Sequence, residues 1–199
     1  MPELIAESYY NQLAAADPAA ICRNGRCHYE KQTGCYRLNI WGMEWLIEPR
    51  EKRISFAVAG GPAHEYFGLF AIYYLLQGKD TPPGEEWISE KDLPGGPTFF
   101  RGPHLIPTDL ISRRFGDDVA AFRAGCEALG GKPLAMADAA YSFPITADLP
   151  LAVLYWAGDE EFPAEARLLY DRSIGEILSL DILFALAVAV CDRLGTAAE

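Results

Sequence analysis

The sequence predicts an α+β fold with an antiparallel or mixed sheet, an N-terminal β-meander, a buried central helix and a C-terminal helix. Three observations support this prediction. Strand-like segments gather in two groups and do not alternate strictly with helices, which argues against a doubly wound parallel sheet. Short turns join three successive strand-like segments near the N-terminus. One long segment in the middle of the chain is apolar almost all round, as expected for a buried helix.

The predicted meander comprises residues 36–48 and 53–58. In the first segment Leu38 and Ile40 alternate with polar residues, Gly42 permits a turn, and the alternation resumes at Trp45. A turn that begins at Pro49 leads into the second segment, which alternates in the same way. Because a period of two directs alternate side chains to opposite faces, each strand should bury one face.

The central helix is predicted over residues 64–77, with Gly78 as its C-terminal stop, and the last helix over residues 180–194. Pro163 suits the first turn of another helix that continues to Tyr170. Three further helices are expected at residues 3–15, 107–115 and 117–129, and two further strands at residues 134–143 and 151–156.

Length and charge restrict the possible functions. The 199 residues suit one domain, in which residues 1–28 form a helix and connector and residues 29–194 form the core. The net charge of −11 disfavours binding to nucleic acid and to anionic membranes. No apolar run reaches the ~20 residues that span a bilayer. The N-terminus lacks the basic and apolar regions of a signal peptide, so we expect a cytoplasmic protein.

The five cysteines are expected to be reduced thiols in that compartment. Cys126 and Cys191 lie on apolar helical faces and should be small core residues. A second group lies within fourteen residues near the N-terminus. Its three thiols and one imidazole could bind zinc, namely Cys22, Cys27, His28 and Cys35. The four residues between Cys22 and Cys27 are a looser spacing than a usual zinc knuckle, and Cys35 begins an alternating strand, so ordinary structural residues are favoured and no metal site is predicted.

An acidic turn, residues 156–163, follows the predicted strand that ends at Trp156. Its three carboxylates are Asp159, Glu160 and Glu161. Carboxylates before a helix accept hydrogen bonds from free backbone N–H groups, which would explain one or two of them. The remaining carboxylate is available to bind a hard cation or to act as a general base.

Asp171 either caps the turn at Ser173 or folds back beside Asp159 and Arg172. A paired Asp–Arg is its plainest structural role. In the second arrangement the three side chains would form a polar cluster near Trp156. These alternatives place Asp171 either among the structural residues or among the candidate site residues.

A proline- and glycine-rich stretch, residues 79–106, is long for a loop, and such loops are often functional. Arg101 and His104 are suited to hold a carboxylate or phosphate of a ligand. We expect the loop 93–104 and the acidic turn to face one pocket, with apolar walls from Trp87, Phe100 and Trp156. His64, at the start of the central helix, is either a hydrogen-bonded entry residue or an axial ligand to a tetrapyrrole.

With these segments placed, the chain resembles an uncharacterised family of domains of unknown function from anaerobic bacteria and archaea, sometimes found behind an iron–sulfur cluster domain. The segments that carry the resemblance are Tyr74-Leu-Leu-Gln-Gly78, Glu86-Trp-Ile-Ser-Glu90, Leu93-Pro-Gly-Gly96, Leu129-Gly-Gly131 and Trp156-Ala-Gly-Asp-Glu-Glu-Phe-Pro163 followed by Leu168-Leu-Tyr-Asp171-Arg-Ser173. The resemblance implies a redox-specialised cell and no particular reaction. Since the chain has no closely spaced four-cysteine run, any iron–sulfur cluster would come from a partner protein.

Three functions remain open. The first is a ligand- or cofactor-binding accessory domain in anaerobic redox or cofactor metabolism. The second is a metal-dependent hydrolase or transferase that uses Asp159, Glu161 and Asp171, and the third is a protein-interaction subunit of a redox complex. The sequence contains no dinucleotide-binding Gly-x-Gly-x-x-Gly after a strand, no P-loop and no nucleophile elbow. The candidate ligand-binding residues are Trp156, Asp159, Glu161, Asp171, Arg101 and His104, and the identity of a cofactor is not predicted.

Overall fold

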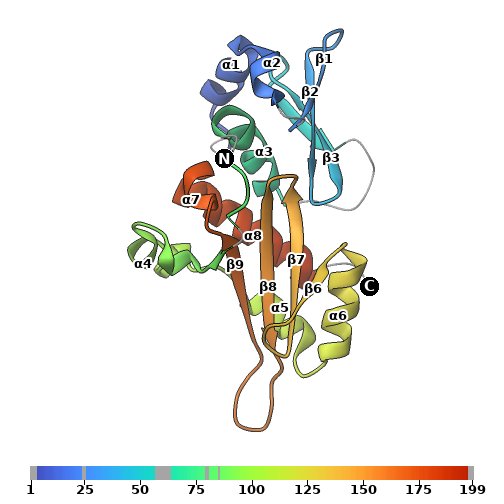
Figure 1. The fold of residues 1–199 in the computed structure, drawn as a ribbon. Coiled ribbons are helices and arrows are strands. Elements are labelled where there is room, and N and C mark those ends of the chain that lie inside the picture. The colour runs from blue at the N-terminus through green and yellow to red at the C-terminus, as the bar shows by residue number, and fades with distance from the viewer. Residues whose placement is uncertain (1–3, 24–25, 57–63, 79–80, 85, 197–199) are drawn as a thin grey trace.

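The computed structural model describes residues 4–23, 26–56, 64–78, 81–84 and 86–196. Within these ranges the fold is α+β and contains two antiparallel sheets (Figure 1). The smaller sheet has the strand order β1-β2-β3-β4, and the larger has the order β5-β9-β8-β7-β6. The predicted fold class is therefore confirmed. None of the helices in these ranges combines the length and apolar composition that crossing a bilayer requires.

The helices, in chain order, are α1 (Glu7–Ala15), α2 (Pro18–Ile21), α3 (Tyr66–Gln77), the 3-10 helix η2 (Glu90–Asp92), α4 (Gly96–Phe99), the 3-10 helix η3 (Gly102–His104), α5 (Asp109–Phe115), α6 (Val119–Ala128), α7 (Ile174–Ile177) and α8 (Leu180–Thr196). The strands are β1 (His28–Glu30), β2 (Cys35–Ile40), β3 (Met43–Glu48), β4 (Arg53–Phe56), β5 (Trp87–Ile88), β6 (Lys132–Leu134), β7 (Ala139–Thr146), β8 (Leu149–Trp156) and β9 (Glu165–Asp171).

The N-terminal meander is present as predicted in β2, β3 and β4, and β1 adds a fourth strand at its edge. Leu38 lies opposite Trp45 in the β2–β3 hairpin, so their side chains share the buried face. The hairpin turns at Trp41 and Gly42, which both adopt positive φ. Residues 57 and 58 of the predicted third strand lie outside the described residues.

The central helix α3 and the C-terminal helix α8 are also as predicted. Seven residues of α3 are buried, and its C-terminus is closed by the Gly78 N–H, which donates to the Tyr74 carbonyl. Helix α8 packs against α3 and α5 across one face of the larger sheet (Figure 1). That face carries the inward residues of the long strands, such as Tyr141, Tyr155 and Tyr170, all of them buried.

The two sheets are joined at the Trp41 turn. The Trp41 backbone N–H donates to the Ile145 carbonyl at 2.7 Å, and its indole N–H donates to the Leu129 carbonyl at 3.0 Å. The indole ring packs edge-on against Phe143, and the Arg193 guanidinium lies 4.4 Å from the indole ring centroid. Trp41 thus connects the meander to β7, to the end of α6 and to α8.

A second junction centres on the Asp148 carboxylate in the β7–β8 turn. The Tyr74 hydroxyl donates to Asp148, the Thr146 hydroxyl donates to it at 2.8 Å, and Arg26 pairs with it at 3.2 Å. Burial, reinforced by the neighbouring carboxylate, raises the pKa of Tyr74. This network connects α3 and the segment before β1 to the larger sheet.

The helix predicted from Pro163 to Tyr170 is wrong, because this segment forms strand β9. Ala166, Leu168 and Tyr170 point into the core, whereas Glu165 and Arg167 are exposed. This period-two burial pattern belongs to a strand, and β9 pairs with β8 along its length. The acidic turn is therefore the loop of a β-hairpin and precedes no helix.

The expectation of five reduced cysteines is also wrong. Cys22, after the end of α2, and Cys27, before β1, form a disulfide with their Cα atoms 4.8 Å apart. These two thiols are unavailable to a zinc site with His28 and Cys35. No group of three metal-binding side chains occurs in the part of the chain that the structure describes. Cys126 and Cys191 are fully buried, as predicted for core residues.

Candidate functional site

A cavity of about 910 Å³ lies between residues 89–108 and strands β8 and β9. Three of the residues singled out in the sequence line this cavity: Arg101, Phe100 and Trp156. Its volume is near the upper end of the ~300–1,000 Å³ typical of ligand sites. Its lining residues are Ser89, Glu90, Lys91, Pro97, Phe100, Arg101, Leu105, Ile106, Thr108, Leu154, Trp156, Glu165, Ala166, Arg167, Leu168 and Leu169. We call this cavity the β9 groove.

The loop wall of the β9 groove is built from short, well-bonded turns. At its start, Ser89 and Asp92 form a capping box, with the Ser89 backbone N–H donating to the Asp92 carboxylate at 2.8 Å. Gly95 then adopts a left-handed conformation with φ of 79°. Gly96 packs against η2 so closely that a Cβ there would lie 1.9 Å from the Glu90 carbonyl oxygen. These contacts set the position of Phe100 and Arg101 opposite β9.

Lys91 and Arg101 bring positive charge to the groove. Both side chains are exposed, and neither forms an ion pair with another described residue. Arg167, on β9, pairs instead with Glu165 at 2.6 Å and lies 5.4 Å from the Trp156 ring centroid. The groove therefore combines two unpaired cations with an aromatic surface that already carries a cation–π contact.

His104 does not line the groove. Its ring stacks on Phe99 with centroids 4.4 Å apart and meets Phe184 edge-on at 5.3 Å. The histidine therefore holds η3 against α4 and α8. Trp87 is likewise absent from the groove lining, because β5 pairs with β9 at the far end of that strand, opposite Asp171.

Asp159 and Glu161 lie in the β8–β9 hairpin loop, which extends beyond the rest of the fold in Figure 1. Asp159 Oδ1 accepts the N–H of Phe162 at 2.7 Å and of Glu161 at 2.8 Å, and these bonds lower the pKa of Asp159. The Asp159 carboxylate thus closes the loop. Glu161 and Phe162 are exposed beside it, and none of the three lines the groove.

Asp171 is buried at the opposite end of β9. Its carboxylate accepts the N–H of Gly84 at 2.7 Å and of Ser173 at 2.9 Å, so it caps the turn before α7. Arg172 pairs with Glu86 instead. Glu165 and Asp171 are six residue steps apart along the strand, about 20 Å at ~3.3 Å per residue. The structure therefore does not bring Asp171 together with the acidic turn.

His64 Nδ1 accepts the Tyr66 backbone N–H at 3.1 Å. This contact agrees with the alternative in which His64 is a hydrogen-bonded residue at the entrance of the helix. It also occupies Nδ1, one of the two ring nitrogens through which a histidine can bind a metal.

Comparison with known proteins gives one match. The model of a family described as a domain of unknown function, DUF3786, covers residues 17–193. The chain belongs to this family. The match confirms the family resemblance and includes both sheets and every residue of the β9 groove. No curated protein and no solved structure matched the chain.

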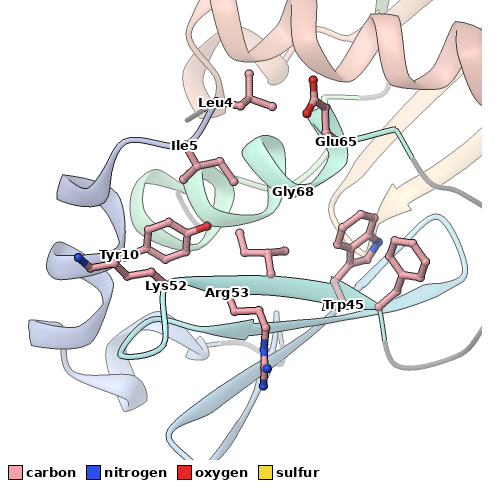
Figure 2. Close-up of a pocket in the computed structure, with 10 residues that line it drawn as sticks. Leu4, Ile5, Tyr10, Trp45, Lys52, Arg53, Glu65 and Gly68 are labelled. Atoms are coloured by element: carbon pink, nitrogen blue, oxygen red, sulfur yellow. The ribbon is translucent and has the colours of Figure 1, made fainter. Parts of the chain in front are cut away.

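The DUF3786 domain has a second cavity, of about 440 Å³, between α1, β4 and α3 (Figure 2). Its rim carries Lys52 and Arg53, but both cations are paired, Lys52 with Glu7 and Arg53 with Glu48. Most of the other lining residues are apolar, among them Trp45. Because its cations are neutralised, this cavity is a weaker candidate than the β9 groove for an anionic ligand.

Sequence reasoning missed Lys91, Leu105 and Arg167 as groove residues. Lys91 directly follows Glu90, the last residue of a segment that carries the family resemblance. Leu105 directly follows His104 and lies four residues after Arg101, both of which the sequence analysis selected. A strand prediction for residues 165–171 would have directed Arg167 to the same face as Trp156. Because residues 163–170 were expected to form a helix, the sequence analysis did not place Arg167 beside Trp156.

Proposed function

We propose that this domain binds an anionic ligand with an apolar portion in the β9 groove. The observation that carries the proposal is a pair of cations, Lys91 and Arg101, that form no ion pair with another described residue and lie in a cavity walled by Trp156 and Leu105. The chain as a whole carries a net charge of −11. The ionisable lining residues of the groove are the cations Lys91, Arg101 and Arg167 and the carboxylates Glu90 and Glu165. Their net charge of +1, opposite in sign to that of the chain, favours an anionic ligand locally.

The residue types suit this role. A guanidinium presents a fork of N–H donors that matches a carboxylate or phosphate, and Arg101 has no competing ion pair among the described residues. Leu105 is 69% exposed, which is unusual for a large aliphatic side chain and provides contact area for an apolar group. Trp156 is half-buried on the opposite wall.

The polar contacts favour binding over chemistry. The Ser89 hydroxyl donates to the Asp92 carboxylate at 2.8 Å, and the Glu165 carboxylate is paired with Arg167. These side chains already hold the groove in shape. The metal-dependent hydrolase or transferase at residues 159–161 receives no comparable support, since Asp159 Oδ1 accepts two backbone N–H groups.

Other parts of the proposal rest on the family resemblance and on sequence composition. The resemblance supports an accessory role in the redox or cofactor metabolism of an anaerobic cell, with an iron–sulfur protein as a partner. The acidic composition supports a domain that does not bind nucleic acid. The cytoplasm is the proposed compartment for this accessory role.

Anilinonaphthalene sulfonate (ANS) tests the proposed site, because it joins a sulfonate to an aromatic body. We expect ANS to bind with enhanced fluorescence and to receive energy from Trp156. Replacing Arg101 with alanine should weaken binding about tenfold, the usual effect of losing one charge-assisted hydrogen bond. The measurement is a fluorescence titration of the wild type and the R101A variant.

Arg113→Ala is the matched control, because Arg113 is an exposed arginine on α5 that pairs with Asp109 and does not line the groove. Its affinity for ANS should equal that of the wild type. Equal affinities for R101A and the wild type would show that the anion is held elsewhere and would contradict the proposed site.

A further inference from the structure

The disulfide between Cys22 and Cys27 differs in its surroundings from the other cysteines of the chain. Cys35, Cys126 and Cys191 are free thiols and are buried. Both residues of the disulfide are partly exposed. The bond joins the residue after α2 to the residue before β1, with a sequence separation of 5. Reaction with a thiol reagent from solution is therefore favoured at this pair over the three buried cysteines.

Two features of this disulfide favour its exchange with another thiol. It closes a ring of a few residues, so it restricts the unfolded chain less than a long-range disulfide would. Arg23, inside the ring, is exposed and forms no ion pair with another described residue. A guanidinium beside a cysteine stabilises the thiolate, which is the form that leaves when a disulfide is attacked.

The elements on either side of the disulfide have hydrogen bonds of their own. The Asp17 carboxylate accepts the Ala19 N–H at 3.1 Å and caps α2, and β1 pairs with β2 along its whole length. Neither contact involves the bond between the two sulfurs. We therefore expect the domain to remain folded when the disulfide is reduced.

The disulfide also positions Arg26, which directly precedes Cys27. The Arg26 backbone N–H donates to the Arg23 carbonyl at 3.4 Å, within the same ring. The Arg26 guanidinium pairs with Asp148 at 3.2 Å and lies 5.3 Å from the Tyr74 ring centroid, and only 9% of the side chain is exposed. The disulfide is therefore adjacent in sequence to a cation at the junction with the larger sheet.

The Arg26 guanidinium occupies a narrow space at the end of α3. A Cβ at Gly78 would lie 2.6 Å from Arg26 Nη1, so the guanidinium closely approaches the C-terminal stop of the helix. The negative end of the helix dipole stabilises a cation there. Without Arg26, the partners of Asp148 among the described residues would be the hydroxyls of Tyr74 and Thr146. The position of Arg26 therefore affects how firmly α3 is held to the larger sheet.

We propose that Cys22 and Cys27 form an exchangeable disulfide, which the dithiol of a partner protein reduces in the folded domain, and that reduction releases Arg26 from Asp148 and α3. A thiolate of the dithiol attacks one sulfur, the S–S bond breaks, and the other sulfur leaves as a thiolate. The second thiol of the reductant then attacks the mixed disulfide and releases the remaining protein sulfur. The protein gains two electrons and two protons, and the reductant becomes a disulfide.

Reduction acts on Arg26 through the chain. Once the cross-link is broken, the end of α2 and the start of β1 are free to separate, and the turn that holds Arg26 against Asp148 is no longer closed. The inference is independent of the ligand proposed for the β9 groove, since Cys22, Arg26, Cys27 and Asp148 do not line that cavity.

Alkylation of the folded protein tests the exchange step. The protein is incubated with dithiothreitol without denaturant, trapped with N-ethylmaleimide and analysed by mass spectrometry with peptide mapping. We expect Cys22 and Cys27 each to carry a label after reduction and neither to carry one before it. Cys126 and Cys191 are the internal controls, because these buried thiols should stay unlabelled while the domain is folded.

Thermodynamic linkage tests the role of Arg26. If the disulfide strengthens the contact between Arg26 and Asp148, that contact stabilises the oxidised form by the same factor. We therefore expect R26A to raise the equilibrium constant for reduction by dithiothreitol about tenfold. Arg23→Ala is the matched control, because it removes a guanidinium from the same ring but none that pairs with Asp148. It should slow the exchange and leave the equilibrium constant close to that of the wild type.

Amide hydrogen exchange on the wild type gives a readout that needs no substitution at the junction. Reduction should speed exchange of the Gly78 amide about tenfold, because Arg26 no longer covers the end of α3, and should leave the Ala189 amide in α8 unchanged.

Labelling of the pair only after denaturation would overturn the exchange step. Unfolding of the whole domain on reduction would identify a purely structural bond and would also overturn the proposal. Equal equilibrium constants for R26A and the wild type, or unchanged exchange at Gly78, would contradict the release of Arg26.

Discussion

Replacing Trp41 with alanine is expected to lower the free energy of unfolding by about 4 kcal/mol, within the range observed when a buried tryptophan is truncated. The side chain is 2% exposed, packs against Phe143 and Phe67, and lies beneath the Arg193 guanidinium. Its loss would leave a cavity where the two sheets meet. Equilibrium denaturation in urea, with the slope compared between variants, measures the effect.

Trp41→Phe is the matched control, because it keeps an aromatic ring and removes the indole N–H that donates to the Leu129 carbonyl. We expect a loss of about 1–2 kcal/mol from that unpaired carbonyl and the smaller ring. Residue 41 has a φ of 46° in the wild-type protein, and Trp, Phe and Ala are all non-glycine residues, so we expect similar backbone strain in the three proteins. A loss below about 1 kcal/mol for the alanine variant would contradict the role of Trp41 as the junction of the sheets.

Replacing Gly96 with alanine should have the second large effect, because the new Cβ would lie 1.9 Å from the Glu90 carbonyl oxygen and 3.1 Å from its carbonyl carbon. Both atoms belong to backbone, so no side chain can move aside. We expect a loss of about 3 kcal/mol or more and, because α4 must separate from η2, the loss of ANS binding in the β9 groove. Thermal unfolding and the ANS titration measure the two effects.

Gly68→Ala provides the control of opposite sign. Gly68 lies inside helix α3, and the nearest neighbour of a Cβ there would be Ile54 Cγ2 at 3.6 Å, an ordinary contact. Alanine should therefore stabilise the protein by about 0.5–1 kcal/mol through its helix propensity. Wild-type stability and wild-type ANS binding in G96A would show that residues 89–108 do not depend on this close packing.

Much of the fold follows from local patterns. The period-two alternation of β2 and β3 and the apolar character of α3 and α8 are visible in the sequence because each element buries a regular face. Strand β9 was mistaken for a helix since Pro163 is typical of a helix start and the adjacent Leu168 and Leu169 interrupt the alternation. Only its pairing with β8 decides between the two structures.

Only part of the candidate site was predicted from the sequence. The positions of the other candidate residues depend on contacts between segments that are far apart in the chain. Arg101, Phe100 and Trp156 share a cavity, as their positions in loops and at a strand end suggested. Asp171 could not be placed from the sequence because its carboxylate accepts the N–H of Gly84, a residue 87 positions away. His104 has the chemistry of a ligand-binding residue, but its stacking on Phe99 and Phe184 depends on how η3 meets α8.

The most direct test of the account is to add ANS to protein labelled at its tryptophans and to follow the indole N–H signals by NMR. Trp156 lines the β9 groove, Trp45 lines the second cavity, and Trp41 is buried between the sheets. We predict that the Trp156 signal shifts in proportion to binding, that Trp45 and Trp41 do not respond, and that R101A weakens the shift. A response at Trp45 with none at Trp156 would place the ligand in the second cavity and contradict the account.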